Sequence, residues 1–560
     1  MSCVAATIVA FAGAARATTY EVGPSKPFST LQAVAPLLNP GDLVLVDGNA
    51  TYPGGIVLDR AGSAASKITI RGVRIAGQRP LLSGGVNTNE FRASHYVFET
   101  FEVAGGSFRG IYHHADDIAI RDCLVRDCPA HGILGADMDS GSLLLEYTEV
   151  RGCGNGTSQH QIYMATDDTR YPQAVFRMQH CWVHDATGGN NVKSRAGRNE
   201  IYSNWIEGAQ FHELELIGAD GQPEDLVRED SDVVGNVLRK ISTQGTFVAR
   251  IGGDGTGTSN GRYRFVGNTI LLAPNTTAAV FRLFTTVQSF EAHDNVVYKV
   301  GGGGAKLTDT SGLTIPVSSV AMAGSHNWVP TGSTNVPAAW TGTMTGATPG
   351  FTDVAALDLR PLPGSPLVDA GVYPTASPPG FPFVKPLGAP IFHPPFHAIG
   401  LPGSAKARPV NGALDVGAFE LPGPVLHGSG EDLALASTVD GLGDPDDPLK
   451  CAATADALSL RVSSPGGALV GSIPILAAQG FPWFAPQAPY PGFPYLHLDP
   501  ALVLNVTPAT GPLTPSGLVV PVVVPAGLSG LTIRFQALAV SLSAANGFFA
   551  TSDPHDVRIE

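Results

Sequence analysis

The feature that most constrains the fold is a short motif that recurs along the chain. Each copy follows a short apolar segment and consists of a small, Asn or Cys position, any residue, and then Val, Ile or Leu. The copies are Phe101-Glu102-Val103, Cys123-Leu124-Val125, Thr148-Glu149-Val150, Cys181-Trp182-Val183, Asn204-Trp205-Ile206, Asn236-Val237-Leu238, Asn268-Thr269-Ile270 and Asn295-Val296-Val297. They start 22, 25, 33, 23, 32, 32 and 27 residues apart. Such a period suits coils of three short strands, so we predict an all-β, right-handed parallel β-helix whose coils stack at about 4.8 Å.

Composition supports this prediction and excludes other classes. The 560 residues include 67 Gly and 45 Pro, and only 15% are charged. An average soluble domain has roughly 25% charged residues, so a coiled coil or an acidic disordered chain is excluded. The net charge of −14 also argues against a nucleic-acid partner, because phosphate binding needs a basic surface.

The chain divides into three predicted segments. Residues 1–17 have an apolar run and end in Ala15-Arg16-Ala17, which is typical of a cleaved signal peptide. Residues 18–422 form the β-helix domain, with an amphipathic N-terminal cap over Ser29–Leu38. Residues 423–560 form a C-terminal β-sandwich-like module, whose role in carbohydrate binding, spacing or anchoring stays open. No stretch reaches the roughly 20 apolar residues of a membrane span, so we expect an exported monomer, extracellular or periplasmic.

Four cysteines fall close together in the β-helix segment: Cys123, Cys128, Cys153 and Cys181. They could form one or two disulfides between neighbouring turns, or be small buried residues.

A polar column can be derived from strand alternation. We take five residues as inward-facing: Ile162, Val192, Leu214, Ala249 and Phe281. Because every second residue of a strand faces outward, the following residues should stack on the outer surface. These residues are Tyr163, Lys193, Glu215, Arg250 and Arg282. Two positions earlier lie Gln161, Asn191 and Glu213, and two positions later lies Arg195.

The outward residues would make a polar groove along the solenoid. A groove of this kind suits an acidic polysaccharide, because arginine pairs bidentately with a carboxylate. For a uronate polymer the natural reaction is β-elimination, in which a base removes the C5 proton and an acid protonates the leaving glycosidic oxygen. We predict Lys193 as the base, its pKa lowered by Arg195 and Arg250, and Tyr163 as the acid. The predicted substrate-binding residues are Arg195, Arg282, Asn191, Gln161 and His160. Alternatively, Lys193 is a surface lysine paired with Glu215.

The segments that close the repeats, 359–371 and 415–420, resemble those of secreted bacterial β-helix proteins, and residues 18–422 resemble the pectate-lyase-like superfamily. Residues 190–196, followed by 199–208 and 212–216, look like the Lys-Ser segment of the alginate lyase and chondroitinase B group. That resemblance implies a base role for Lys193, an arginine acid on the next coil, and calcium. Residues 215–218 stand where the arginine belongs, and Arg250, one coil further on, could replace it.

Histidines and carboxylates offer rival assignments. His160, His180, His184 and His212 fall in the same coils, and either His212 or a His160–Tyr163 pair could run the elimination without metal. Calcium could be held by Glu213, Glu215 and Asp220, or by the neighbouring loop at Asp167 and Asp168.

Three functions therefore compete. The first is a secreted polysaccharide lyase. The second is a glycoside hydrolase, which needs carboxylates about 5 to 10 Å apart and would draw them from Glu213, Glu215 and Asp220. The third is a non-catalytic carbohydrate-binding surface or matrix protein, which is favoured if the column is fully salt-bridged and no cleft exists.

Overall fold

The computed structural model describes residues 17–220, 229–241, 247–382, 387–409, 412–422, 426–442, 444–483, 489–491, 493, 495–507, 511–542, 544 and 546–559. All of the predicted signal peptide except its last residue lies outside these ranges, as does the start of the predicted C-terminal module at residue 423.

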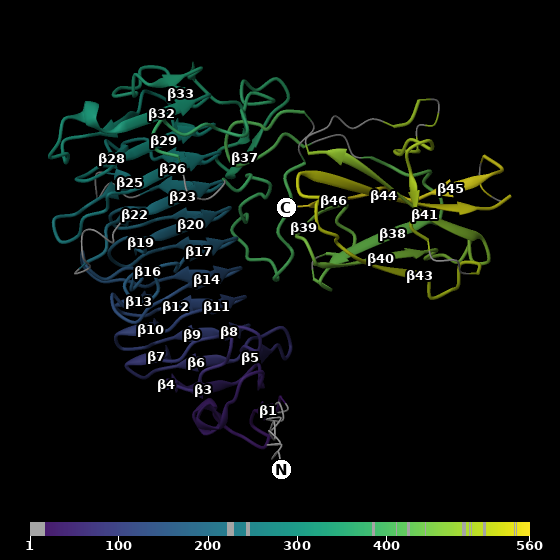
Figure 1. Ribbon diagram of the computed structural model, residues 1–560, viewed down its shortest axis with the longest axis horizontal. Helices are drawn as coiled ribbons and strands as arrows, with labels where there is room; N and C mark the ends of the chain where they lie inside the picture. Colours follow the sequence, from purple (N-terminus) through teal and green to yellow (C-terminus); the bar gives the residue numbers. More distant parts are fainter. Residues whose placement is uncertain are drawn as a thin grey trace, which may run out of the picture.

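Three long parallel sheets form the body of the molecule, and the chain runs through them in turn in each coil (Figure 1). Sheet A contains β1 (Thr19–Val22), β2 (Leu43–Asp47), β5 (Ile68–Val73), β8 (Tyr96–Glu99), β11 (Ile118–Arg121), β14 (Leu143–Glu146), β17 (Phe176–Gln179), β20 (Arg198–Tyr202), β23 (Asp230–Val234), β26 (Arg262–Val266), β29 (Ser289–His293), β32 (Ala321–Ser325) and β34 (Trp340–Thr341). Sheet B contains β3 (Thr51–Pro53), β6 (Leu81–Ser83), β9 (Glu102–Ala104), β12 (Leu124–Arg126), β15 (Glu149–Arg151), β18 (Trp182–His184), β21 (Trp205–Glu207), β24 (Val237–Lys240), β27 (Thr269–Leu272), β30 (Val296–Lys299), β33 (Trp328–Pro330) and β35 (Met344–Gly346). Sheet C contains β4 (Ile56–Leu58), β7 (Asn87–Phe91), β10 (Arg109–His113), β13 (His131–Gly135), β16 (Ile162–Ala165), β19 (Val192–Arg195), β22 (Leu214–Ile217), β25 (Phe247–Gly252), β28 (Ala279–Leu283) and β31 (Lys306–Asp309).

The recurring motif marks the entry of each coil into sheet B. Its eight copies lead into β9, β12, β15, β18, β21, β24, β27 and β30, which are consecutive neighbours in that sheet. The asparagines of the last four copies, together with Asn327 before β33, form a buried ladder of Asn204, Asn236, Asn268, Asn295 and Asn327. Each backbone N–H from Asn204 to Asn295 donates to the Oδ1 of the next asparagine at 2.8 to 3.0 Å. In these later coils the asparagine recurs because its amide side chain satisfies buried backbone groups at the turn.

The interior of the solenoid is a continuous apolar core. Inward residues of the three sheets, such as Val103, Ile120 and Ile133, are fully buried and pack in one cluster. A short helix α1 (Leu31–Val34) continues into the 3₁₀ turn η1 (Ala35–Leu37), and Leu31 and Val34 join that cluster. An amphipathic segment therefore covers the open N-terminal end, as predicted.

The four clustered cysteines are buried free thiols, so the predicted alternative of disulfides between turns is wrong. Backbone N–H of Cys128 lies 3.5 Å from the Cys153 sulfur one coil on, and both side chains are shielded from solvent. The cysteines serve as small core residues, as in the alternative interpretation.

Beyond the solenoid the strands pair antiparallel, with a single parallel pair among the described strands, Leu449–Ala452 with His555–Ile559. The 3₁₀ turn η2 (Val317–Ser319) still belongs to the solenoid, between β31 and β32. After the hairpin of β36 (Phe351–Asp353) and β37 (Asp358–Pro361), two sheets share a second core. One contains β38 (Ala434–Val439), β40 (Ala457–Ser463) and β43 (Leu518–Val523). The other contains β39 (Leu449–Ala452), β41 (Ile473–Pro482), β42 (Leu504–Asn505), β44 (Leu531–Val540), β45 (Phe549–Thr551) and β46 (His555–Ile559). This is the predicted β-sandwich module.

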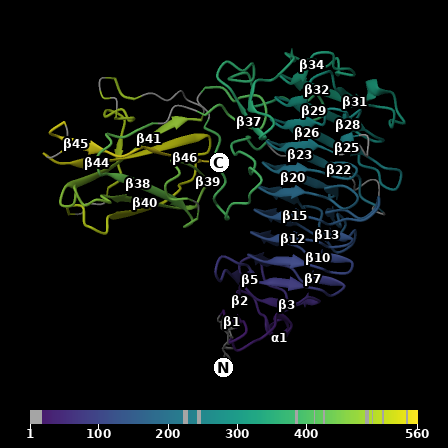
Figure 2. The ribbon, with the colours of Figure 1, turned by 180° about the vertical axis from the view of Figure 1, so that it is seen from behind.

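The module lies beside the C-terminal half of the solenoid in both views (Figures 1 and 2). The Arg558 guanidinium of β46 donates to the Arg408 backbone oxygen at 2.6 Å, which ties the module to the connecting segment. None of the described helices is long and apolar enough to cross a membrane.

Candidate functional site

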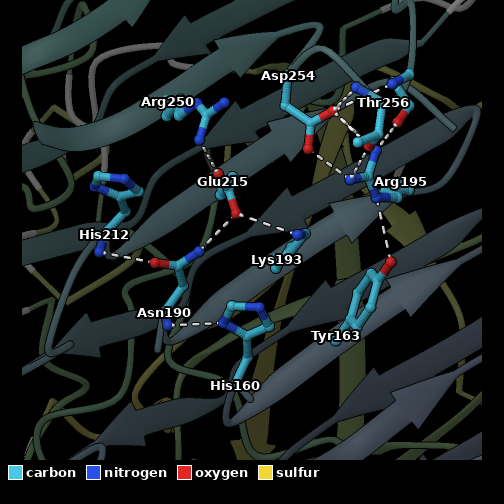
Figure 3. Close-up of polar contacts among 12 residues, drawn as sticks. His160, Tyr163, Asn190, Lys193, Arg195, His212, Glu215, Arg250, Asp254 and Thr256 are labelled. Atoms are coloured by element: carbon cyan, nitrogen blue, oxygen red, sulfur yellow. Dashed lines mark hydrogen bonds and ion pairs between the residues drawn. The ribbon is translucent and has the colours of Figure 1, made fainter. Parts of the chain in front are cut away.

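The predicted column exists on the outer face of sheet C. The pairing of β16, β19, β22, β25 and β28 places the five inward residues in one register and the five outward residues in the next. The outward column is Tyr163, Lys193, Glu215, Arg250 and Arg282. The inward residues are fully buried, as the alternation requires. Figure 3 shows the centre of this column and its neighbours.

Lys193 occupies the middle of the column. Its Nζ lies 5.0 Å from the centroid of the Tyr163 ring and 3.7 Å from Oε2 of Glu215, and 16% of the side chain is exposed. Burial lowers the pKa of Lys193; Glu215 opposes this, and the positive charges of Arg195 and Arg250 add to it. A larger fraction of Lys193 is therefore neutral at a given pH than for an ordinary surface lysine.

The Glu215 carboxylate contacts three side chains: Arg250, Asn190 and Lys193. Its Oε1 accepts a hydrogen bond from Nη1 of Arg250 at 2.8 Å, and its Oε2 accepts one from Nδ2 of Asn190 at 2.7 Å. With Lys193 nearby, this carboxylate is almost completely buried and fully engaged. It therefore positions the basic groups rather than offering an open ligand site.

Arg195 was predicted to bind substrate, but its guanidinium is 4% exposed. It donates to Asp254 Oδ2 at 2.6 Å, to Thr256 Oγ1 at 3.1 Å and to the Gly218 backbone oxygen at 2.5 Å. The loop after β25 thus folds back over Arg195 and covers it. The side chain that was predicted to bind substrate is therefore covered in this structure, where it anchors the loop and contacts Tyr163.

Tyr163 lies beside Lys193, whose Nζ is above its ring. Its oxygen accepts a hydrogen bond from Nε of Arg195 at 3.2 Å and donates to Oδ1 of Asp137 at 3.3 Å. Burial, together with the Asp137 charge, raises the pKa of Tyr163 well above its usual value, against the influence of Arg195. Tyr163 therefore keeps its proton at neutral pH and can donate it.

A second polar column flanks the first, three positions earlier in each coil. Nδ1 of His131 accepts the backbone N–H of His160 at 3.2 Å, and Nδ1 of His160 accepts that of Asn190 at 3.0 Å. Oδ1 of Asn190 accepts the backbone N–H of His212 at 3.0 Å. Burial lowers the pKa of His131 to about 4 and that of His160 to about 2, so both rings are neutral near pH 7.

The two predicted histidines of this column have different surroundings. His160 is 2% exposed, so its predicted contact with substrate is not available in this structure. His212 is half-buried, its Nδ1 is 3.4 Å from the Phe247 backbone oxygen, and burial lowers its pKa to about 4. Of the rival histidines, His180 is buried against Tyr147 and His184 stacks on Trp182, both away from Lys193.

Gln161, Asn191 and Glu213 do not face outward, which corrects their predicted roles. All three are fully buried. Gln161 donates to Asn191 at 2.8 Å, and Asn191 donates to Glu213 at 2.6 Å. They precede β16, β19 and β22 at the bend that leads into sheet C, where strand alternation does not apply. They form an internal hydrogen-bonded ladder.

The predicted calcium ligands do not come together. Glu213 is internal, both oxygens of Glu215 have protein partners, and Asp220 is exposed at the end of a described stretch. Across the described ranges, no group of three His, Cys, Asp or Glu side chains is placed to hold a metal ion. The described structure therefore does not bring Glu213, Glu215 and Asp220 together as one ligand set.

Arginines and aromatic rings continue the column beyond Glu215. The Arg250 guanidinium lies 4.7 Å from the centroid of Phe284, and that of Arg282 lies 4.7 Å from Phe247 and 5.1 Å from Phe284. Arg282 has no carboxylate partner among the described residues, in contrast to Arg250. Its guanidinium is thus available to an acidic ligand.

Sequence reasoning missed Asn190, Asp254 and Asp137. Asn190 had a usable signal, because His131, His160, Asn190 and His212 have the same spacing as Leu134, Tyr163, Lys193 and Glu215. Asp254 lies in a Gly-rich loop whose path over Arg195 has no signature in the repeat. Asp137, which follows β13, likewise lies outside the repeated strands, so the repeat does not predict its position.

No protein-family model matches the chain, and no curated protein matches it. Solved structures similar to it include pectate lyase Pel9A, at 12% identity and a TM-score of 0.42, covering 73% of this chain and 98% of that one. An alginate lyase from Paenibacillus sp. has 16% identity, a TM-score of 0.32 and coverages of 53% and 99%. A PL6 family polysaccharide lyase from Pseudopedobacter saltans has 12% identity, a TM-score of 0.37 and coverages of 57% and 90%.

A shared fold does not determine chemistry, so the function must rest on the residues of the site. The three stacked parallel sheets, through which the chain passes in turn in each coil, make this protein a parallel β-helix.

Proposed function

We propose that this protein is a secreted polysaccharide lyase that cleaves a uronate-containing polymer by β-elimination. The observation that carries the proposal is the position of Lys193, a partly exposed amine with a lowered pKa, directly beside a protonated tyrosine in the same column. A base and an acid with opposed pKa shifts, in adjacent coils on one face, are the two groups that elimination needs.

In the proposed reaction the Lys193 amine takes the C5 proton of a uronate residue. The C5 electron pair forms the C4–C5 double bond as the C4–O bond breaks. The Tyr163 hydroxyl gives its proton to the departing glycosidic oxygen, while Arg195 stabilises the resulting phenolate at 3.2 Å. The guanidinium of Arg250, partly exposed beside Glu215, neutralises the C6 carboxylate.

The two competing functions fare differently. A hydrolase needs an acid and a base or nucleophile among open carboxylates, yet Glu213 is internal and Glu215 is paired with Arg250, so of the three predicted carboxylates only Asp220 is exposed. A non-catalytic binding protein stays a real candidate, because these same ion pairs stabilise the column without any reaction. Turnover decides between the lyase and the binding protein.

The test uses the mature chain on alginate, pectate, chondroitin sulfate, dermatan sulfate, heparin and ulvan. Absorbance in the near ultraviolet reports the unsaturated uronate end that only elimination produces, and a parallel arm with chelator reports any need for a divalent cation. Lys193→Ala should abolish the signal with an unchanged melting temperature. Lys299→Ala, a partly exposed lysine on β30 of sheet B, is the matched control and should retain it.

Each outcome has a distinct meaning. New reducing ends without unsaturation would establish hydrolysis. Polymer binding without any new ends would establish the binding protein. Turnover that survives Lys193→Ala would remove Lys193 as the base.

A further inference from the structure

Arg109, at the start of β10, is an arginine that no part of the proposed chemistry uses. Its guanidinium carbon lies 4.1 Å from the centroid of the Phe108 ring and 4.0 Å from that of Tyr112. Nη1 donates to Oδ1 of Asn87 at 3.1 Å. Two aromatic contacts and one hydrogen bond fix the orientation of the side chain before any ligand arrives.

This guanidinium has no carboxylate partner among the described residues. Glu90 is the nearest acidic group on the neighbouring strand β7, but its oxygens are taken by Arg92 at 2.6 Å, His114 at 3.0 Å and Asn87 at 2.9 Å. Nε of Arg109 is buried and has no acceptor in the described part of the chain. A partly buried, oriented and unpaired positive charge is costly unless a ligand compensates it.

Arg109 belongs to the same surface as Lys193. It pairs in register with His131, so it continues the column of His131, His160 and Asn190. Both Arg109 and Lys193 act on His131, whose pKa their charges help to lower after burial. Between Arg109 and Lys193 lie three coil steps, from β10 through β13 and β16 to β19, or roughly 14 Å.

The opposite side of Lys193 has a matching group. Arg282 lies on β28, three coil steps beyond β19, and it too lies over aromatic rings without a carboxylate partner among the described residues. The two unpaired guanidinium groups therefore lie at equal distances on either side of the amine. An extended 1,4-linked glycan advances by about one coil spacing per sugar, so both arginines lie within reach of one chain.

We propose that Arg109, held between Phe108 and Tyr112, is a distal subsite for the carboxylate of an acidic sugar residue about three residues from the one at Lys193. The subsite rests on the proposed function for its link to cleavage, but its ligand class follows from the unpaired guanidinium itself. Together with Arg282, it places cleavage within a bound chain rather than at its end.

The test measures binding by the full chain carrying Lys193→Ala, which prevents turnover. Probes are a galacturonate hexamer, a mannuronate hexamer and the carboxyl-reduced form of each, titrated by calorimetry. Adding Arg109→Gln should weaken binding of an acidic hexamer about tenfold and leave the reduced hexamer unchanged. Arg121→Gln is the matched control: this arginine lies in the same coil on sheet A, paired with Glu146, and its loss should change binding less than twofold. Arg109→Lys keeps the charge but not the planar fork, and should give an intermediate loss.

The outcomes separate this subsite from the lyase itself. Tight binding that depends on Arg109, in a protein whose wild type makes no unsaturated ends, would keep the subsite and refute the lyase. Turnover by the wild type with hexamer binding unaffected by Arg109→Gln would refute the subsite and keep the lyase. Absence of binding by either acidic hexamer would also refute the subsite. If Arg109→Gln changes the melting temperature, Arg109→Lys takes its place in the comparison. The subsite then requires that Arg109→Lys binds the acidic hexamer more weakly and the carboxyl-reduced hexamer with unchanged affinity.

Discussion

Replacing Glu215 by Gln should move the pH profile of the reaction toward acid. The Glu215 carboxylate lies 3.7 Å from the Lys193 amine and favours its protonated form. At this distance two unit charges interact by about 1 kcal/mol in bulk water and about 4 kcal/mol at an effective dielectric of 20. Because 1.36 kcal/mol corresponds to one pKa unit and Lys193 is partly exposed, we expect its pKa to fall by about 1 to 2 units.

The sign follows from which form of lysine reacts. The base must be neutral, so kcat/KM rises as pH increases through the pKa of Lys193. Removing the negative charge lowers that pKa, and the rising limb therefore moves to lower pH by about 1 to 2 units. Arg250 also loses its partner in this variant, and its unpaired positive charge acts on Lys193 in the same direction.

The assay is kcat/KM for unsaturated-end formation across pH on whichever polymer the wild type cleaves. Glu149→Gln is the matched control, since this glutamate on sheet B pairs with Arg151 and His184 and should leave the limb in place. A limb that stays where it is in Glu215→Gln, or that moves to higher pH, would refute the assignment of the titrating base to Lys193.

Three further predictions concern the acid, the fold and pH. Tyr163→Phe should reduce kcat by about 10²- to 10⁴-fold with little change in oligosaccharide affinity, since the ring beside Lys193 remains; unchanged kcat would exclude Tyr163 as the acid. Asn236→Ala should lower the free energy of unfolding by about 3 kcal/mol in urea titrations, because it removes the buried side-chain acceptor of the Asn204 backbone N–H and the side-chain donor to the Ile201 carbonyl; Asn39→Ala, on an exposed turn, should cost far less. Burial lowers the pKa of His180 to about 3, so the unfolded chain binds more protons between about pH 6.5 and 3 and stability falls as pH decreases through that window. His180→Phe should flatten this decline in a series of melting temperatures, and an equally steep decline would contradict the assignment.

The coil stack and the outward column could be predicted from the sequence because both depend on local periodicity. The motif that leads into sheet B fixes where each coil starts, and alternation within a strand then fixes which side Lys193 faces. Both rules are properties of the strand itself and need no knowledge of loops. The sandwich module followed in the same way from its alternating strands.

The rest of the site depends on contacts outside the strands. Gln161 and Asn191 precede their strands at a bend, where parity no longer reports orientation, so extending the column by two residues placed them on the wrong side. Arg195 does obey parity, but a loop from two coils further on closes over it through Asp254. Neither the bend nor the path of that loop is encoded in a period, which is why these positions could not be assigned.

The distribution of paired and unpaired arginines would allow a protein of net charge −14 to bind the proposed polyanion. At the centre of the column, Arg250 and Arg195 are paired with Glu215 and Asp254, so they are held rigidly and attract a distant anion little. At the two ends, Arg109 and Arg282 have no such partners in the described part of the chain, so their field is uncancelled at short range. Attraction of a polyanion therefore acts mainly at the two ends of the column. At the centre, the arginines and their carboxylate partners keep Lys193 from forming a strong ion pair with the substrate carboxylate. Such an ion pair would raise the pKa of Lys193 and make it a weaker base.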